Sequence, residues 1–138
     1  MIQRILIVED DPLIAMELES IANQLGYCVA GIARSFESAR IFAPRAEIAL
    51  VDVNLADGAT GPRVAQYLSE EFAVSVVMVT GNPEALGDAF SWSIGVVSKP
   101  AKPATIEALL GFVIALRNNT PIAPPPELRL FSRSARDC

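Results

Sequence analysis

Five short apolar runs, each followed by a stretch with helical periodicity, limit the fold of this chain more than any other feature. The runs are Arg4–Val8, Tyr27–Ile32, Glu47–Val51, Val74–Val79 and Ile94–Ser98. Short runs that are apolar almost throughout are typical of parallel strands buried on both faces. Parallel strands need crossover connections, which are usually right-handed helices. The sequence therefore predicts an α/β fold, a doubly wound five-stranded parallel sheet with helices on both faces.

The stretches between the runs carry ordinary helix start and stop signals. Five helices are expected, beginning near Pro12, Ser35, Pro62, Glu84 and Pro103. Proline is favoured in a first helical turn and serine at the N-cap, while Gly26 and Pro44 end the first two helices. The fourth helix is short, over Glu84–Trp92, because little chain separates the strands on either side of it.

The last part of the chain has a different composition. Four prolines stand close together at positions 121, 124, 125 and 126. Such a segment predicts an extended linker followed by a flexible tail, so we divide the chain into a domain over 1–118 and a tail over 119–138. A docking segment for a partner or a neighbouring copy is the alternative interpretation of this tail.

Composition excludes several classes of function. The formal net charge is −5, which argues against a general nucleic-acid binder. The chain has no histidine, so Ser-His-Asp and Cys-His catalysis, HExxH zinc sites and an internal phosphohistidine are excluded. Cys28 and Cys138 offer neither a disulfide framework nor metal-ligand spacing, and Met1–Val8 does not resemble a signal peptide. A cytoplasmic protein is the expectation.

Polar residues follow four of the predicted strands, where ligands bind in doubly wound sheets. They are Glu9, Asp10 and Asp11 after the first strand, Asp52 after the third, Thr80 at the end of the fourth and Lys99 after the fifth. Several carboxylates in one crevice repel one another unless a cation lies between them. Carboxylate oxygens together with a phosphate suit Mg²⁺, so the acids predict a magnesium site.

The same residues predict phosphoryl chemistry. A carboxylate is ionised at neutral pH and can attack phosphorus directly, which makes Asp52 a candidate nucleophile. Lys99 and the metal would neutralise charge on the phosphoryl oxygens, and Thr80 would donate a hydroxyl hydrogen to one of them. Asp11 is expected to be a solvated residue at a helix start, and Asp57 a turn residue with Gly58.

Four segments, ILIVEDDPLI, LVDVNL, VMVTG and VVSKP, stand in this order at successive strand ends. Together they resemble the receiver domain of bacterial two-component response regulators over about residues 3–118. The resemblance implies a flavodoxin-like fold with strand order 2-1-3-4-5. It implies that Asp10 binds Mg²⁺ directly, Glu9 through water and Asn54 through its main-chain carbonyl, with Asp52 as both ligand and phosphoacceptor.

Further roles follow from the same resemblance. Thr80 would be the switch hydroxyl and Lys99 the phosphate-binding lysine of a phosphorelay, with a partner sensor histidine kinase or histidine phosphotransfer protein as donor. Val96 stands at the second switch position, where receivers usually carry an aromatic residue. The chain would act as a stand-alone response regulator that signals by protein–protein contact, and a homodimer is left open. It would catalyse only its own phosphorylation and slow dephosphorylation. Its Thr-Gly and Leu-Ala-Asp-Gly segments look like receivers of alphaproteobacterial general-stress pathways.

Three other functions are compatible with parts of this pattern. A flavin-binding protein of this fold needs a hydroxyl- and glycine-rich loop after the first strand, whereas this loop is triply acidic. A small phosphatase of the haloacid-dehalogenase type would carry its nucleophile after the first strand rather than at Asp52. A pseudo-receiver, which binds partners without phosphoryl transfer, is the main alternative, because Val96 departs from the usual pattern.

Overall fold

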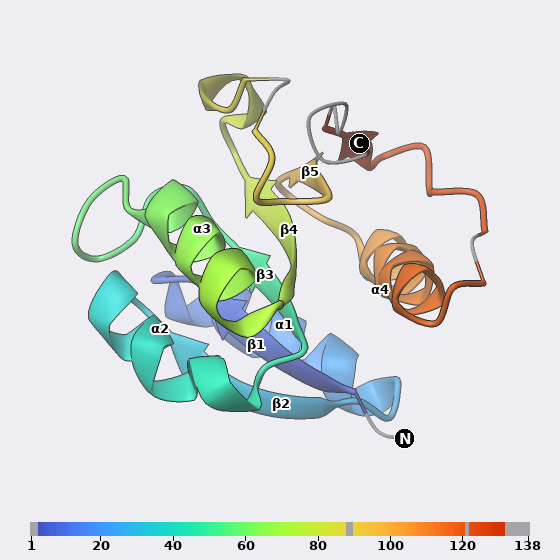
Figure 1. Cartoon of the computed structure of the whole chain (residues 1–138), viewed down its shortest axis with the longest axis horizontal. Helices are drawn as coiled ribbons and strands as arrows, with labels where there is room; N and C mark the ends of the chain where they lie inside the picture. The colour runs from blue at the N-terminus through green and yellow to red at the C-terminus, as the bar shows by residue number, and fades with distance from the viewer. Residues whose placement is uncertain (1–2, 88–89, 121, 132–138) are drawn as a thin grey trace.

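The computed structural model describes residues 3–87, 90–120 and 122–131, which form an α/β sandwich around one sheet (Figure 1). The strands are β1 (Arg4–Val8), β2 (Cys28–Ala33), β3 (Ile48–Val51), β4 (Ser75–Thr80), β5 (Gly95–Ser98) and β6 (Arg129–Leu130). The α-helices are α1 (Pro12–Gln24), α2 (Phe36–Phe42), α3 (Gly61–Phe72) and α4 (Pro103–Arg117), with 3₁₀ turns η1 (Ala43–Arg45) and η2 (Pro83–Ala85).

The sheet has the order β2-β1-β3-β4-β5-β6, and its first five strands are parallel. The predicted doubly wound fold with order 2-1-3-4-5 is therefore confirmed. The sixth strand, which pairs antiparallel with β5, was not predicted. None of the described helices has the length and apolar character needed to cross a bilayer.

Two apolar cores lie on opposite faces of the sheet, because side chains alternate along each strand. On β1, Leu6 and Val8 point to the core beneath α2 and α3, whereas Ile5 and Ile7 point to the core beneath α1 and α4. Strands β1 and β3 lie in the middle of the sheet and are buried on both faces, as their uninterrupted apolar sequences predicted.

The helix starts use the caps that the sequence indicates. The side chain of Asp11 accepts hydrogen bonds from the main-chain N–H groups of Leu13 and Ile14, and Ser35 forms a capping box with Ser38. Asp11 is exposed, so its predicted role as a solvated helix-start residue is confirmed.

The prediction of a helix over Glu84–Trp92 is wrong for the described part of that segment. Residues 83–85 form the 3₁₀ turn η2, and residues 86–87 and 90–94 contain no helix. Gly81, Pro83 and Gly87 lower helix propensity in this short connection. Consequently α4 corresponds to the predicted helix that begins near Pro103.

Residues 128–131 do not form part of a flexible tail, which corrects the prediction for that segment. Arg129 and Leu130 pair with β5, and the side chains of Leu128 and Phe131 are buried. Burial of apolar side chains against the edge of β5 lowers the free energy of the folded state. The composition of residues 119–138 does not reveal that this edge is available. Residues 132–138 lie outside the described part of the chain, and the division near residue 118 remains a prediction.

Candidate functional site

Glu9 and Asp52 lie side by side because they follow neighbouring parallel strands. Val8 of β1 is in register with Val51 of β3, and the N–H of Asp52 donates to the carbonyl of Val8 at 3.0 Å. Both carboxylates stand at the carboxyl edge of the sheet and are buried, with 3% and 8% of each residue exposed. This placement agrees with the sequence prediction that strand-end acids share one crevice.

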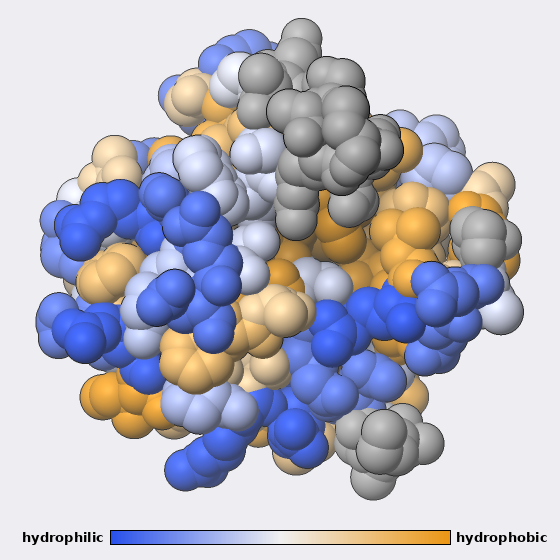
Figure 2. All heavy atoms as spheres, in the orientation of Figure 1, coloured by the Kyte–Doolittle hydropathy of each residue, from blue (hydrophilic) through white to orange (hydrophobic). Residues whose placement is uncertain are grey.

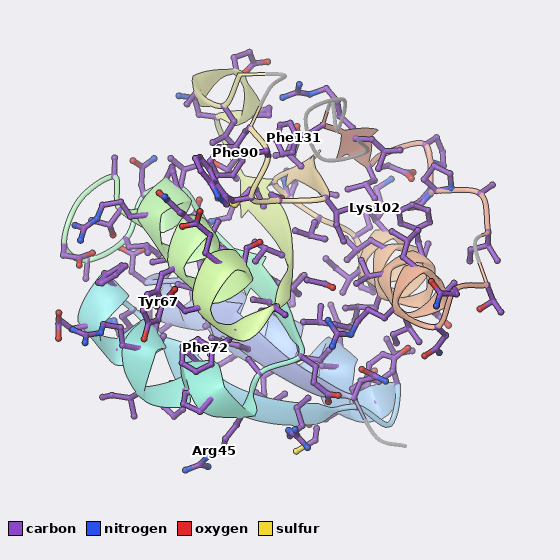
Figure 3. All side chains as sticks on the ribbon, viewed as in Figure 1. Arg45, Tyr67, Phe72, Phe90, Lys102 and Phe131 are labelled. Atoms are coloured by element: carbon purple, nitrogen blue, oxygen red, sulfur yellow. The ribbon has the colours of Figure 1, made fainter. Side chains whose placement is uncertain are left out.

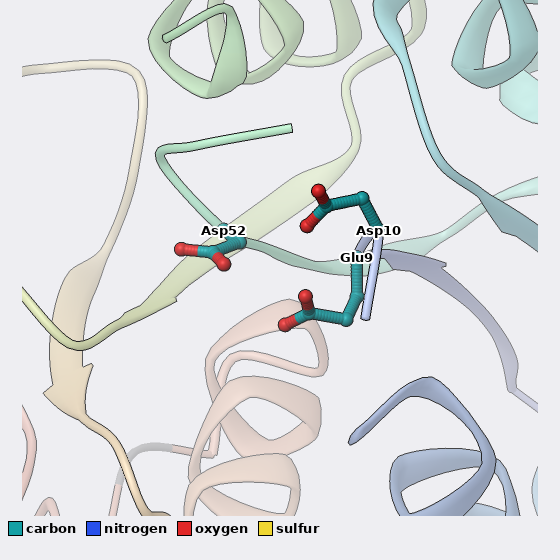
Figure 4. A group of neighbouring side chains, drawn as sticks. All are labelled: Glu9, Asp10 and Asp52. Carbon is teal, nitrogen blue, oxygen red and sulfur yellow. The ribbon is translucent and has the colours of Figure 1, made fainter. Parts of the chain in front are cut away.

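Asp10 completes a cluster of three acids. Carboxylate oxygens of Glu9, Asp10 and Asp52 all lie within 4.8 Å of one another, and Figure 4 shows the three groups around a common space. Three hard oxygen donors at this separation fit a divalent cation such as Mg²⁺. Asn54 lies two residues beyond Asp52 with an exposed side chain, and the part its carbonyl would play remains a prediction.

Lys99 joins this cluster from the end of β5. Its Nζ atom lies 2.6 Å from Oε1 of Glu9 and 2.6 Å from Oδ2 of Asp52, with 18% of the side chain exposed. The N–H of Lys99 donates to the carbonyl of Thr80 at 2.9 Å, which holds the chain after β5 beside the end of β4. One ammonium group therefore bridges two carboxylates from two other strands.

The pKa values of this group reflect burial and hydrogen bonding. Burial raises the pKa of Glu9 above its ordinary value, and this effect outweighs the hydrogen bonds from Lys99 and from the N–H of Asp11. Burial acts to lower the pKa of Lys99, but hydrogen bonds and charge from Asp52 and Glu9 outweigh it and raise the pKa. Lys99 is therefore a permanent cation at neutral pH.

Thr80 and Val96 occupy different environments. Thr80 ends β4 as a buried residue, and its hydroxyl oxygen accepts a hydrogen bond from the N–H of Asn82 at 3.1 Å. Val96 is buried in the middle of β5, within the core on the α2–α3 face. Thr80 thus lies at the edge that carries the acid cluster, whereas Val96 packs in the interior away from that edge.

Two residues after β3 make contacts that were not predicted: Asp57, in the loop before α3, and Gly61, the first residue of α3. Asp57 uses both oxygens: Oδ1 accepts from the hydroxyl of Thr60 at 2.6 Å, and Oδ2 accepts from the N–H of Phe36 at 3.1 Å. Its prediction as a turn residue is correct, but it also attaches the loop to the start of α2. Gly61 packs against the main chain of Asp52 and Val53, and the Gly-Pro pair that begins α3 could have drawn attention to it.

Comparison with known proteins agrees with the fold. The family model described as the response regulator receiver domain matches residues 5–111. The chain belongs to the response regulator receiver domain family. The family membership and the flavodoxin-like receiver fold predicted from the four sequence segments are therefore confirmed, and residues 5–111 form a signalling domain.

The receiver domain is similar to several regulators named PhyR. It is 36% identical over 114 residues to the phyllosphere-induced regulator PhyR of Methylorubrum extorquens, covering 80% of this chain and 43% of that protein. The solution structure of the PhyR receiver domain from Erythrobacter litoralis superposes with a TM-score of 0.74 at 30% identity, covering 90% of this chain and 95% of that one.

Crystal structures of longer relatives show the same similarity. PhyR from Brucella abortus gives a TM-score of 0.77 at 28% identity, covering 87% of this chain and 51% of that one. PhyR from Bartonella quintana, described as an anti-anti-sigma factor, gives 0.74 at 27% identity, covering 86% and 50%. The receiver domain thus spans about half the length of these relatives, and less than half of the curated one.

Proposed function

We propose that this receiver domain accepts a phosphoryl group on Asp52 in a Mg²⁺-dependent reaction and then signals by protein–protein contact. The observation that carries the proposal is the position of Lys99, whose ammonium group contacts both Glu9 and Asp52 at 2.6 Å. A lysine that already neutralises two acids is suitably placed to neutralise a phosphoryl group on one of them. Catalysis of phosphoryl transfer depends mainly on positioning and on such charge stabilisation.

Asp52 is oriented for attack. Its Oδ1 atom accepts a hydrogen bond from the N–H of Val53 at 2.7 Å, and its Oδ2 atom accepts from Lys99. In the proposed step, a carboxylate oxygen of Asp52 forms a bond to phosphorus while the bond from phosphorus to the donor histidine nitrogen breaks. The imidazole keeps that electron pair and takes a proton from solvent. Hydrolysis later reverses the modification: water attacks phosphorus, the bond from phosphorus to the Asp52 oxygen breaks, and inorganic phosphate leaves while Asp52 regains its carboxylate.

The neighbouring residues would bind the metal ion and the phosphoryl oxygens. Glu9, Asp10, Asp52 and the carbonyl of Asn54 would hold Mg²⁺, which when bound supplies positive charge to the phosphoryl oxygens. Lys99 would pair with another of these oxygens. Thr80 accepts a hydrogen bond from Asn82, so the hydrogen of its own hydroxyl can be donated to a phosphoryl oxygen.

The partner that supplies the phosphoryl group would be a sensor histidine kinase or a histidine phosphotransfer protein, since this chain has no histidine. The kinase at the start of such a relay takes the phosphoryl group from ATP, so the cytoplasm is the proposed location. Phosphorylation would shift the balance between two states of the surface around residues 81–94, β5 and α4. The downstream partner would recognise that surface on this chain or on a homodimer.

A partner-binding module without phosphoryl transfer is the second candidate. Val96 favours it, because an aliphatic residue stands where this family usually has an aromatic switch residue. The similarity to a protein described as an anti-anti-sigma factor also favours a role in which protein binding is the main activity. The presence of all the acceptor-site residues favours the first candidate.

The two candidates predict different masses. We would incubate the protein with Mg²⁺ and acetyl phosphate and measure the intact mass. The first candidate predicts an adduct of about 80 Da, which is absent in Asp52→Asn and retained in Glu70→Gln, an exposed carboxylate on α3. An unmodified mass, under conditions that label another receiver domain, would reject phosphoryl transfer. Turnover of small phosphate esters in the same samples would instead indicate a phosphatase.

A further inference from the structure

Strand β6 closes an edge of the sheet that the five parallel strands leave open. Leu130 is in antiparallel register with Gly95 and Arg129 with Val96, and the N–H of Phe131 donates to the carbonyl of Ile94 at 3.1 Å. An uncovered edge strand presents unpaired N–H and C=O groups to solvent and to other chains. The segment 128–131 therefore satisfies main-chain groups of β5.

The same segment packs into both cores. Leu128 is 5% exposed and belongs to the core beneath α1 and α4, whereas Phe131 is 3% exposed and belongs to the core beneath α2 and α3. The ring of Phe131 meets that of Phe90 edge to face at 5.7 Å, and Figure 3 shows these rings beside each other. Phe131 thus packs beside Phe90 in the core beneath α2 and α3.

Gly95 of β5 allows residues 128–129 to pack closely against the strand. A Cβ atom at Gly95 would lie 2.6 Å from the carbonyl oxygen of Arg129 and 2.9 Å from Cδ1 of Leu128. Only glycine at position 95 lets the main chains of β5 and β6 approach so closely. Figure 2 shows that hydrophobic residues gather on the visible surface around β5 and α4. Close backbone approach and apolar anchors together indicate a specific contact of residues 128–131 with β5.

A chain of hydrogen bonds connects this segment to Thr80. The guanidinium group of Arg129 donates to the carbonyl of Pro83 at 3.2 Å. Pro83 directly follows Asn82, whose N–H donates to the hydroxyl oxygen of Thr80 at 3.1 Å. A movement of Thr80 that breaks this bond would release residues 82–83 and with them the contact to Arg129.

The attachment is also small enough to detach. Strand β6 has two residues, and the prolines at 124–126 before it have no N–H groups with which to extend the pairing. A two-residue edge strand with few main-chain hydrogen bonds opens at a lower free-energy cost than the central strands of the sheet. We propose that residues 128–131 form a latch on β5 that is released when Thr80 moves toward a phosphoryl oxygen and out of reach of the N–H of Asn82. This inference rests on the proposed function, because the phosphoryl group on Asp52 is what would draw Thr80 away.

Two measurements on the full chain report whether residues 128–131 stay bound to β5. Hydrogen–deuterium exchange measures protection in the peptides that contain Ile94–Val97 and Leu128–Phe131. The emission of Trp92, which is the only tryptophan of the chain, reports the aromatic contact, because its ring lies 5.7 Å from that of Phe90. With Mg²⁺ and acetyl phosphate, we expect exchange in both peptides to become about tenfold faster and the Trp92 emission to shift to longer wavelength.

Variants test the latch without phosphorylation. Thr80→Ala removes the acceptor for Asn82 and should speed exchange in both peptides severalfold, whereas Thr80→Ser retains the hydroxyl and should resemble the wild type. Arg129→Ala breaks the other end of the path, and combining it with Thr80→Ala should add little, because both changes release the same segment.

The outcomes separate the two proposals. If the adduct forms but exchange in both peptides stays unchanged, the latch is wrong while the proposed function stands. If no adduct forms, the proposed function fails, and the Thr80 and Arg129 variants alone decide whether the segment is coupled to Thr80. Equal protection in the wild type, Thr80→Ala and Arg129→Ala would overturn the inference.

Discussion

Gly61 packs directly against the main-chain carbonyl of Asp52, so closely that no side chain could be placed on its α-carbon. Its N–H donates to the carbonyl of Val53 at 2.9 Å. The first residue of α3 therefore returns to the end of β3 and supports the segment that carries the proposed phosphoacceptor. Helix position and site geometry are linked through this one contact.

The Gly61→Ala variant should lose stability and phosphoryl acceptance together. The added methyl group would meet main-chain atoms, which cannot move aside as a side chain can, so we expect a loss of about 1–3 kcal/mol in the free energy of unfolding. Urea unfolding and the acetyl phosphate assay measure the two effects. Gly111→Ala is the matched control, because open space surrounds Gly111 within α4. There, alanine should stabilise the protein by about 0.5–1 kcal/mol.

Mg²⁺ should stabilise the wild-type protein through the three acids. At a concentration about 100 times the dissociation constant, the expected gain in unfolding free energy is about 2.7 kcal/mol. Asp10→Asn should weaken binding by about tenfold or more, because an amide replaces a carboxylate in the cluster. Asp11→Asn removes the same charge and keeps a good N-cap, so its thermal shift with Mg²⁺ should match the wild type. Equal shifts in both variants would contradict the site.

Lys99→Ala should destabilise the metal-free protein and increase its response to Mg²⁺. Without Lys99, the buried acids Glu9 and Asp52 lose their shared cation, and because the lysine is partly exposed we expect a loss of about 1–3 kcal/mol. Added Mg²⁺ should recover more stability in this variant than in the wild type. Lys102→Ala is the control, since Lys102 is exposed and makes no capping hydrogen bond with its side chain. Unfolding in urea with and without Mg²⁺ decides between these outcomes.

Asp57 should contribute to acid stability. Its pKa lies below the ordinary value of 3.8, chiefly because the hydroxyl of Thr60 donates to it. An acid whose folded-state pKa is lowered stabilises the fold above its unfolded-state pKa and loses that contribution as the pH falls through the folded-state value. Asp57→Asn should therefore lower the urea midpoint at pH 6, and the difference from the wild type should shrink below pH 3.8.

The exposed Glu70→Gln variant of α3 controls for a general loss of negative charge in these titrations. A midpoint difference between Asp57→Asn and the wild type that stays constant from pH 6 to the acid limit would show that charge on Asp57 does not stabilise the loop.

The five parallel strands and the main residues of the site could be predicted from the sequence, because both depend on short-range sequence patterns. Uninterrupted apolar runs identify strands buried on both faces, and parallel strands bring their carboxyl ends to one edge. Residues directly after those runs, such as Glu9, Asp52 and Lys99, therefore had to approach one another once the strand order was known. Glu9 and Asp52 follow the neighbouring strands β1 and β3. Lys99 follows β5, and its long side chain reaches across the end of β4 to both carboxylates.

Contacts between distant parts of the chain were decided only by the tertiary structure. Composition over 119–138 predicted a tail, yet Leu128 and Phe131 are buried, because β6 pairs with β5 and brings these two side chains against the two cores. The fit of Gly61 against Asp52 and of Gly95 against Arg129 likewise depends on the relative position of two main chains. A sequence pattern records what each segment can form, whereas close packing between segments appears only when their surfaces meet.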